Sequence, residues 1–113
     1  MIRVLIILVS FLFINFSSYA NEDSKKCIGL YEKGKYSLAL PYCLKSSKGH
    51  EFYLGYIYSR DNKCSLSHRW YKKSGDTDSM LNMSIQLIYG TRGCKQDINR
   101  GKNYLLEIND KEG

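Results

Sequence analysis

The sequence lacks four short signatures that mark common enzyme classes. Its 113 residues contain no G-x-S-x-G nucleophile elbow, no S-x-x-K, no H-E-x-x-H and no phosphate-binding glycine loop. Ser67 and His68 are chain neighbours, and neighbouring side chains on a helix do not face one another, so we expect no catalytic pair there. The sequence therefore predicts a protein that is not an enzyme, with no catalytic residue and no cofactor.

Metal-binding and redox motifs are also missing. There is no C-x-x-C pair, and the two histidines, His50 and His68, show no ligand spacing to the cysteines. No cysteine is expected in the basic surroundings at a helix start that are typical of a reactive thiol. We therefore expect neither a metal site nor a redox-active cysteine.

Proline is scarce, and no segment alternates between apolar and polar residues as a half-buried strand does. The single proline, Pro41, is expected early in its helix, where its missing N–H costs least. The aspartates in turns and helix starts are expected to cap helices, with Asp78 as the N-cap of a helix through Met80, Met83 and Leu87. These features favour an all-α fold.

The longest apolar run, Val4 to Phe16, is too short to span a bilayer comfortably, since a spanning helix needs about 20 apolar residues. Arg3 precedes this run and small residues ending in Ala20 follow it, as in a secretory signal. We expect residues 1–20 to be a cleaved signal peptide; a retained membrane anchor is the alternative. Residues 21–113 are expected to form a single helical-repeat domain, periplasmic or secreted, without stable membrane insertion.

All four cysteines follow this leader, which indicates two disulfides formed in an oxidising compartment. Four cysteines allow three pairings. Cys27 and Cys43 lie eight residues on either side of Lys35, the middle of a predicted turn, so they share one level of an antiparallel helix pair. Cys64 and Cys94 each follow the turn of their hairpin. We predict the pairs Cys27–Cys43 and Cys64–Cys94, each stabilising the fold by about 3 kcal/mol on a loop-entropy model.

Three segments align as copies of one helical hairpin: residues 27–46, 54–74 and 85–106. Each has a tyrosine at the end of its first helix and, in its second helix, a small residue followed three positions later by an aromatic one. This spacing places both on one helix face. The small residues are Ala39, Ser67 and Gly101, and the aromatic residues are Tyr42, Trp70 and Tyr104. We expect a short α-solenoid of about three antiparallel hairpins, stapled by two disulfides.

Two motifs of the middle segment carry a family resemblance. Residues 54–58 contain L-G-x-x-Y and residues 70–74 read W-Y-K-K-S. They resemble the Sel-one-like repeats, a branch of the tetratricopeptide repeats, and residues 97–104 and 34–40 are similar to them more loosely. The resemblance implies an exported, cysteine-rich protein that clips helices within a repeat. Some exported members are credited with penicillin binding or hydrolysis, a remote alternative here because S-x-x-K is missing.

The charge balance favours an acidic partner. The chain carries a net charge of +6, and only Arg3 lies in the predicted leader, so the remainder keeps +5. A charge of this size speeds encounter with acidic partners. The basic residues are scattered among acidic ones, so nucleic-acid binding is not expected.

A surface of stacked hairpins rich in tyrosine is typical of a protein-binding module. We predict a protein partner, bound by exposed side chains of the middle hairpin, while Trp70 lies in the core. The predicted binding residues are Tyr53, Tyr56, Arg69, Tyr71 and Lys72. The expected role is that of a periplasmic antagonist, such as an immunity protein against a secreted bacterial toxin. The alternative is a secreted or periplasmic adaptor or virulence factor that docks on envelope or host proteins.

The predicted leader gives a first test. The exported protein should begin at Asn21, because the apolar run ends in a small-residue cleavage site. Intact-mass analysis of the exported chain checks this, and a mass that retains residues 1–20 would contradict it.

Overall fold

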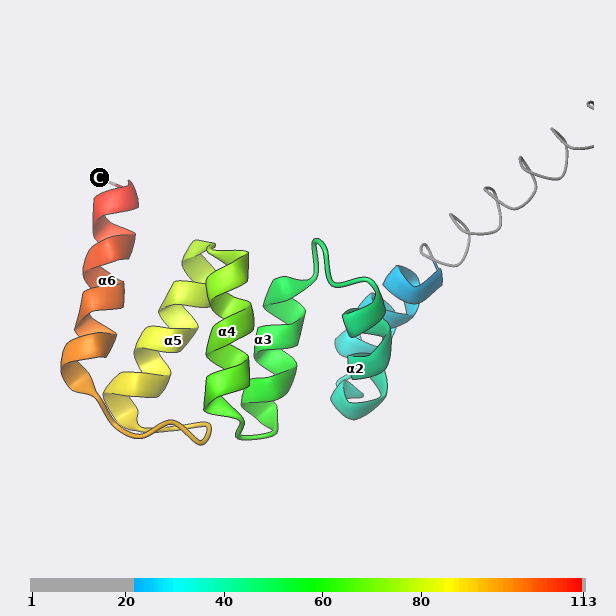
Figure 1. Cartoon of the computed structure of the whole chain (residues 1–113), viewed down its shortest axis with the longest axis horizontal. Coiled ribbons are helices and arrows are strands. Elements are labelled where there is room, and N and C mark those ends of the chain that lie inside the picture. The colour runs from blue at the N-terminus through cyan, green and yellow to red at the C-terminus, as the bar shows by residue number, and fades with distance from the viewer. Residues whose placement is uncertain (1–21, 113) are drawn as a thin grey trace, which may run out of the picture. The chain divides into compact units, whose positions relative to one another are not determined.

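Helices make up all the regular structure of the described chain. The computed structural model describes residues 22–112, and no strand occurs within that range. Helical residues 22–32 are followed by five labelled helices (Figure 1): α2 (Tyr36–Lys45), α3 (Glu51–Arg60), α4 (Cys64–Ser74), α5 (Thr77–Tyr89) and α6 (Ile98–Glu112). The prediction of an all-α protein built from helical hairpins is confirmed.

Two compact units divide the chain, with the boundary between Ser46 and Ser47. The first unit contributes one hairpin, formed by helical residues 22–32 and α2. The second contains the hairpin of α3 and α4 and the hairpin of α5 and α6, with α4 packed against α5. The predicted signal peptide and its cleavage site lie outside the described residues.

A disulfide holds the first hairpin together. Cys27 and Cys43 are bonded, as predicted, and both are fully buried. Ala39, the predicted small residue of this hairpin, is also fully buried one turn before Cys43. Such a short hairpin buries little apolar surface, so the covalent link is a large part of what keeps it folded.

The position of Pro41 differs from the expected one. We expected it early in its helix, but it is the sixth residue of the ten in α2, because the helix begins only at Tyr36. The carbonyl of Ser37 therefore loses its usual helical donor four residues on. Pro41 and Ser37 are both exposed, so water is available to that carbonyl.

Two hydroxyl groups tie together the helices of the second unit's hairpins. The Ser67 Oγ on α4 donates to the Gly55 carbonyl on α3, at 2.7 Å. In the next hairpin the Ser84 Oγ on α5 donates to the Gly101 carbonyl on α6, at 2.8 Å. A side chain on Gly55 would meet the Tyr71 ring, and one on Gly101 would meet the backbone of α5, so each glycine permits a close helix contact. Each bond also gives a buried serine hydroxyl an acceptor. Ser67 and Gly101 are buried, as their predicted role requires.

The core of the second unit is built around Tyr71. Its ring is fully buried with Met80 and Met83, and it lies where a side chain on Gly55 would stand. Its hydroxyl accepts a hydrogen bond from Asn82 Nδ2, at 3.2 Å. This pairing satisfies the polar end of a ring whose apolar part fills the core.

This arrangement corrects the expected roles of Trp70 and Tyr71. We predicted Trp70 in the core and Tyr71 on the surface, but Tyr71 is 0% exposed, whereas Trp70 is only half-buried and has the Lys73 ammonium 4.5 Å from its ring centre. The cause is Gly55, which opens space on α3 for the ring one position further along α4. The repeat motif alone did not show which of the two adjacent rings enters that space.

The cap of α5 is also different from the predicted one. Asp76, not Asp78, is the N-cap, and its carboxylate accepts a hydrogen bond from the Ser79 N–H. Burial raises the pKa of Asp76, but hydrogen bonds from Ser79 and Ser74 outweigh that effect and lower it below its ordinary value. The helix begins at Thr77, so Asp78 lies inside its first turn, where a negative charge still favours the helix dipole.

Within residues 22–112, no helix is both long and apolar enough to cross a membrane. This finding covers the described helices alone.

Two glycine substitutions test the packing. Gly55→Ala should destabilise the protein, because the new methyl group meets the buried Tyr71 ring; overpacking costs about 1–3 kcal/mol, partly offset by about 1 kcal/mol of helix propensity. Gly29→Ala is the matched control, since no atom lies within 4 Å of the added methyl, and it should stabilise by about 0.5–1 kcal/mol. Urea unfolding followed by circular dichroism measures both. Equal effects of the two changes would rule out the Gly55–Tyr71 contact.

Candidate basic cleft beside a disulfide

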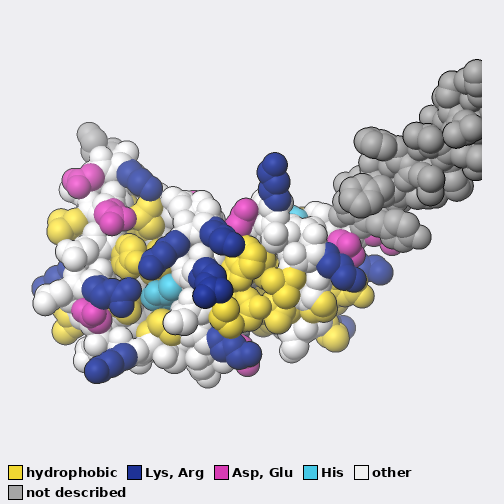
Figure 2. Space-filling model, in the orientation of Figure 1, with side chains coloured by type: hydrophobic (Ala, Val, Ile, Leu, Met, Phe, Trp, Pro, Cys, Tyr) yellow, Lys and Arg dark blue, Asp and Glu magenta, His cyan; other side chains and the backbone are white. Residues whose placement is uncertain are grey.

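A cleft in the second unit collects basic side chains around a disulfide and a histidine. Its volume is about 470 Å³, and most of its lining comes from α4, with one residue each from α5 and α6. The lining residues are Cys64, Ser65, His68, Arg69, Lys72, Lys73, Leu87 and Arg100. Figure 2 shows Lys and Arg side chains gathered around a histidine over this part of the molecule. None of these described lining residues is acidic.

The chain builds this cleft with helical spacing and one cap. On α4, Arg69, Lys72 and Lys73 lie three and four residues apart, which places them on one side of the helix. Arg100 stands in the first turn of α6, where its N–H donates to the Asp97 carboxylate, at 3.2 Å. This capping bond fixes the start of α6, so the Arg100 side chain is presented from a rigid element.

The second predicted disulfide lies at this cleft. Cys64 and Cys94 are bonded, with their Cα atoms 5.0 Å apart, so both predicted pairings are confirmed. Cys94 is buried, whereas Cys64 is only half-buried and is one of the residues that line the cleft. The two cysteines of this bridge therefore differ in exposure, and Cys64 is the more exposed residue.

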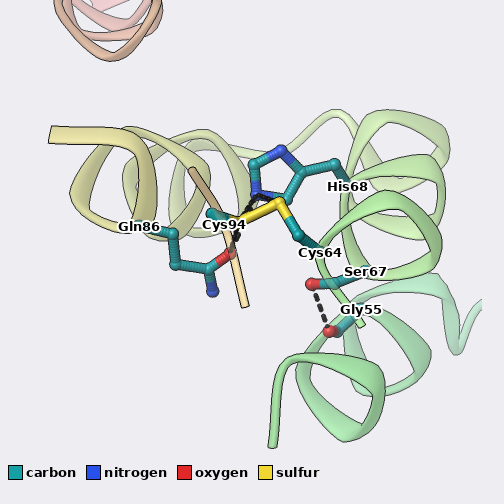
Figure 3. The surroundings of a disulfide bond; sticks show 6 residues. All are labelled: Gly55, Cys64, Ser67, His68, Gln86 and Cys94. Carbon is teal, nitrogen blue, oxygen red and sulfur yellow. Dashed lines mark hydrogen bonds between the residues drawn. A yellow bond between two sulfur atoms is a disulfide. The ribbon is translucent and has the colours of Figure 1, made fainter. Parts of the chain in front are cut away.

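His68 lies against the disulfide (Figure 3). Its Nε2 is 3.5 Å from Cys94 Sγ, 3.7 Å from Cys64 Sγ and 2.8 Å from the side-chain oxygen of Gln86. An amide oxygen only accepts hydrogen bonds, so the Nε2 is the protonated ring nitrogen and its N–H donates a hydrogen bond to Gln86 Oε1. A protonated Nε2 is thus held beside both sulfur atoms.

The surroundings of His68 keep its ring neutral. Burial lowers its pKa below the ordinary value of 6.5; the bond to Gln86 raises it, and the positive charges of Lys72 and Arg100 lower it further. The lowered pKa follows from removing water from the charged form and from repulsion by nearby cations. These two charges therefore act on the same ring from α4 and α6.

This cluster was not predicted. Cys64 and His68 are four residues apart on one helix, and the His68 ring nitrogen lies within 4.8 Å of both sulfurs of the Cys64–Cys94 disulfide. We also expected no cysteine in a basic setting at a helix start, but Cys64 is the first residue of α4 and lines the basic cleft. The i, i+4 spacing was visible in the sequence; the contribution of Cys94 depended on the fold.

The predicted partner-binding residues do not form one surface patch. Arg69 and Lys72 line the basic cleft, whereas Tyr56 and Tyr71 line a separate hollow with Asn82 and other residues. Tyr53 is half-buried and packs edge-on against Phe52. Tyr71 does not offer the free surface we expected, because it fills the core.

A second surface was not predicted. Leu81, Ile85 and Tyr89 follow one another at intervals of four along α5 and are 40%, 43% and 70% exposed. Ile85 also borders the hollow lined by Tyr56. We call Leu81, Ile85 and Tyr89 the α5 stripe. Their spacing of four is visible in the sequence, but whether they are exposed depends on which face of α5 packs against α6.

The chain matches no protein-family model, no curated protein and no solved structure. The likeness to Sel-one-like repeats therefore depends on the sequence motifs alone. In the structure those motifs fall on α3 and α4, where the motif glycine, Gly55, packs against the Tyr71 ring with no room for a side chain.

The charge state of His68 can be measured directly. Its imidazole should titrate below pH 6.5 in an NMR titration of the oxidised protein, and Lys72→Gln should raise the midpoint by removing a nearby cation. The folded protein resists protonation here more than the unfolded chain does. This contribution to stability is therefore fully present above pH 6.5 and is lost as the pH falls from 6.5 through the lowered pKa of the folded state. A midpoint at or above 6.5 would contradict the buried, cation-flanked placement.

Proposed function

We propose that this protein is an exported helical-repeat protein that binds another protein by taking an acidic segment of it into the basic cleft. One observation supports this most directly: four cationic side chains, Arg69, Lys72, Lys73 and Arg100, meet at one cleft with no acidic side chain in its described lining. The cleft is also large enough to admit several side chains of a partner.

The electrostatics of the cleft favour a binding site for acidic groups over a basic helix face that only contacts solvent. Charges spread over an open helix surface are screened within about 8–10 Å at physiological salt. Here two of the cations, Lys72 and Arg100, reach the buried His68 ring closely enough to lower its pKa. A concave site lined by cations from two helices has a strong positive electrostatic potential at its centre. This potential speeds encounter with acidic partners and favours them over other proteins.

The proposed location follows from the disulfides and the leader. Both bridges are formed and no free cysteine occurs among the described residues, which is typical of proteins in a non-reducing, exported environment. The apolar leader of residues 4–16 supports export to the periplasm or beyond. Binding an acidic segment is an activity shared by an antagonist of a secreted toxin and by an adaptor on envelope or host proteins. The identity of the partner separates these two roles.

Binding of a glutamate-rich peptide tests the cleft. The wild-type protein should bind it in a salt-dependent way, as measured by fluorescence anisotropy. The double variant Lys72→Gln with Arg100→Gln should bind about tenfold more weakly, since each exposed ion pair contributes up to about 1 kcal/mol. Lys45→Gln is the control, because Lys45 occupies the last turn of α2 as Lys72 occupies the last turn of α4. Equal loss in control and double variant would overturn the proposed site.

The same variants serve as baits for the natural partner in envelope extracts. A protein captured by wild type and Lys45→Gln but not by the double variant is the expected result, and it should carry an acidic segment. The variant Ile85→Ser tests whether the partner binds the exposed α5 stripe instead. If that change abolishes capture while the double variant keeps it, the partner binds the stripe and the cleft is not its site.

A further inference from the structure

The two disulfides of this protein lie in opposite environments. In the Cys27–Cys43 bridge both residues are fully buried inside the first hairpin. In the Cys64–Cys94 bridge, Cys64 is half-buried and lines an open basic cleft, while Cys94 is buried behind it. The cleft therefore lets a thiolate in solution approach Cys64, whereas neither cysteine of the other bridge is exposed. Access is one of the factors that set the rate of thiol–disulfide exchange.

Three features stabilise negative charge at Cys64. It is the first residue of α4, where the backbone N–H groups of the first turn point outward without helical partners. The described N-cap residue, Lys63, makes no side-chain capping bond that would satisfy them. The cleft beyond it is lined by cations of α4 and α6. Such surroundings favour a cysteine thiolate over the thiol.

The buried partner has a hydrogen-bond donor of its own. His68 Nε2 lies 3.5 Å from Cys94 Sγ, and in the oxidised protein its N–H donates a hydrogen bond to the Gln86 oxygen. If the disulfide opens, the same N–H is in place to donate to a Cys94 thiolate. Both products of opening the bridge are therefore stabilised by groups already in position.

We propose that the Cys64–Cys94 bridge is an exchangeable disulfide that reacts with small anionic thiols at Cys64. The incoming thiolate attacks Cys64 Sγ, a new sulfur–sulfur bond forms between them, and the Cys64–Cys94 bond breaks. The electron pair of that bond leaves as the Cys94 thiolate, which accepts a hydrogen bond from His68. A second thiolate then attacks the reagent sulfur of this mixed disulfide, which forms the disulfide of the reagent and releases Cys64 as a thiolate. Overall, two thiols are oxidised and one protein disulfide is reduced.

The basic cleft selects the charge of the thiol. An anionic thiol is attracted by Lys72, Arg69 and Arg100 on its way to Cys64, whereas a cationic thiol is repelled. No such charge selection is expected at Cys27–Cys43, because both cysteines are fully buried in the folded hairpin. This inference needs only a small thiol, so it stands or falls independently of the proposed protein partner.

Three thiols of similar size test the proposal on the full oxidised protein: 2-mercaptoethanesulfonate is anionic, 2-mercaptoethanol is neutral and cysteamine is cationic. Reactions are quenched with iodoacetamide, and peptide mapping gives the rate at each bridge, corrected for the thiolate fraction of each reagent. Cys64–Cys94 should react at least about tenfold faster than Cys27–Cys43, with the mixed disulfide on Cys64. The sulfonate should be the fastest reagent by about tenfold and cysteamine the slowest, with the difference fading in high salt.

Variants separate the parts of the mechanism. Lys72→Gln should reduce the preference for the anionic reagent, while Lys45→Gln should leave it unchanged. His68→Phe keeps a ring of similar size but removes the donor, so in the mixed disulfide the Cys94 thiol should lose its thiolate absorbance in the ultraviolet at a pH where the wild type retains it. This absorbance reports on the thiolate itself and not on the overall fold.

Several outcomes would overturn the proposal. They are equal rates at the two bridges, a mixed disulfide found mainly on Cys94, or a charge preference that is absent or reversed in the wild-type protein. Each of these is read from the wild-type protein, so a poorly folding variant does not leave the question open. Failure of the glutamate peptide to bind, with the exchange behaviour intact, would count against the proposed partner only.

Discussion

The bond between Cys64 and Cys94 determines where the functional groups of the second unit lie. It ties the first residue of α4 to the loop just before α6, so the start of α6 and its Arg100 are held near the basic side chains of α4. The same bond brings Cys94 and the Gln86 oxygen around the His68 ring. The cleft, the neutral histidine and the concentration of positive charge all depend on this one covalent constraint.

Noncovalent contacts between helices also hold the second unit together. The Ser67 and Ser84 hydroxyls each bond to the carbonyl of a glycine in the facing helix, which holds α3 to α4 and α5 to α6. These bonds favour one helix placement, because a misplaced helix would leave a buried serine hydroxyl without its acceptor. The glycines supply the close approach, and the Tyr71 ring fills the space beside Gly55. The second unit therefore combines tight helix pairs with one covalent tie across them.

Much of this architecture was predictable from local spacing. Level matching around Lys35 and the positions of Cys64 and Cys94 after their turns predicted both disulfides, and the small residues Ala39, Ser67 and Gly101 lie at buried contacts. What could not be predicted depends on rotation about the helix axis. Trp70 and Tyr71 are adjacent, and only the open space above Gly55 decides which ring is buried. The cleft likewise required Arg100, which lies in a different hairpin from Lys72 and is brought near it by folding.

The Cys64–Cys94 bond also has a topological consequence. Together with the backbone it closes a covalent ring that contains all of α4 and α5 and the exposed turn at Gly75 and Asp76. A protease that cuts inside this ring leaves the two fragments covalently joined, whereas a cut beyond it leaves the released piece held by helix packing alone. Opening the ring by the proposed thiol exchange would remove the covalent link between fragments already cut inside it. Exchange at this bridge would thus link oxidation state to resistance to proteolysis.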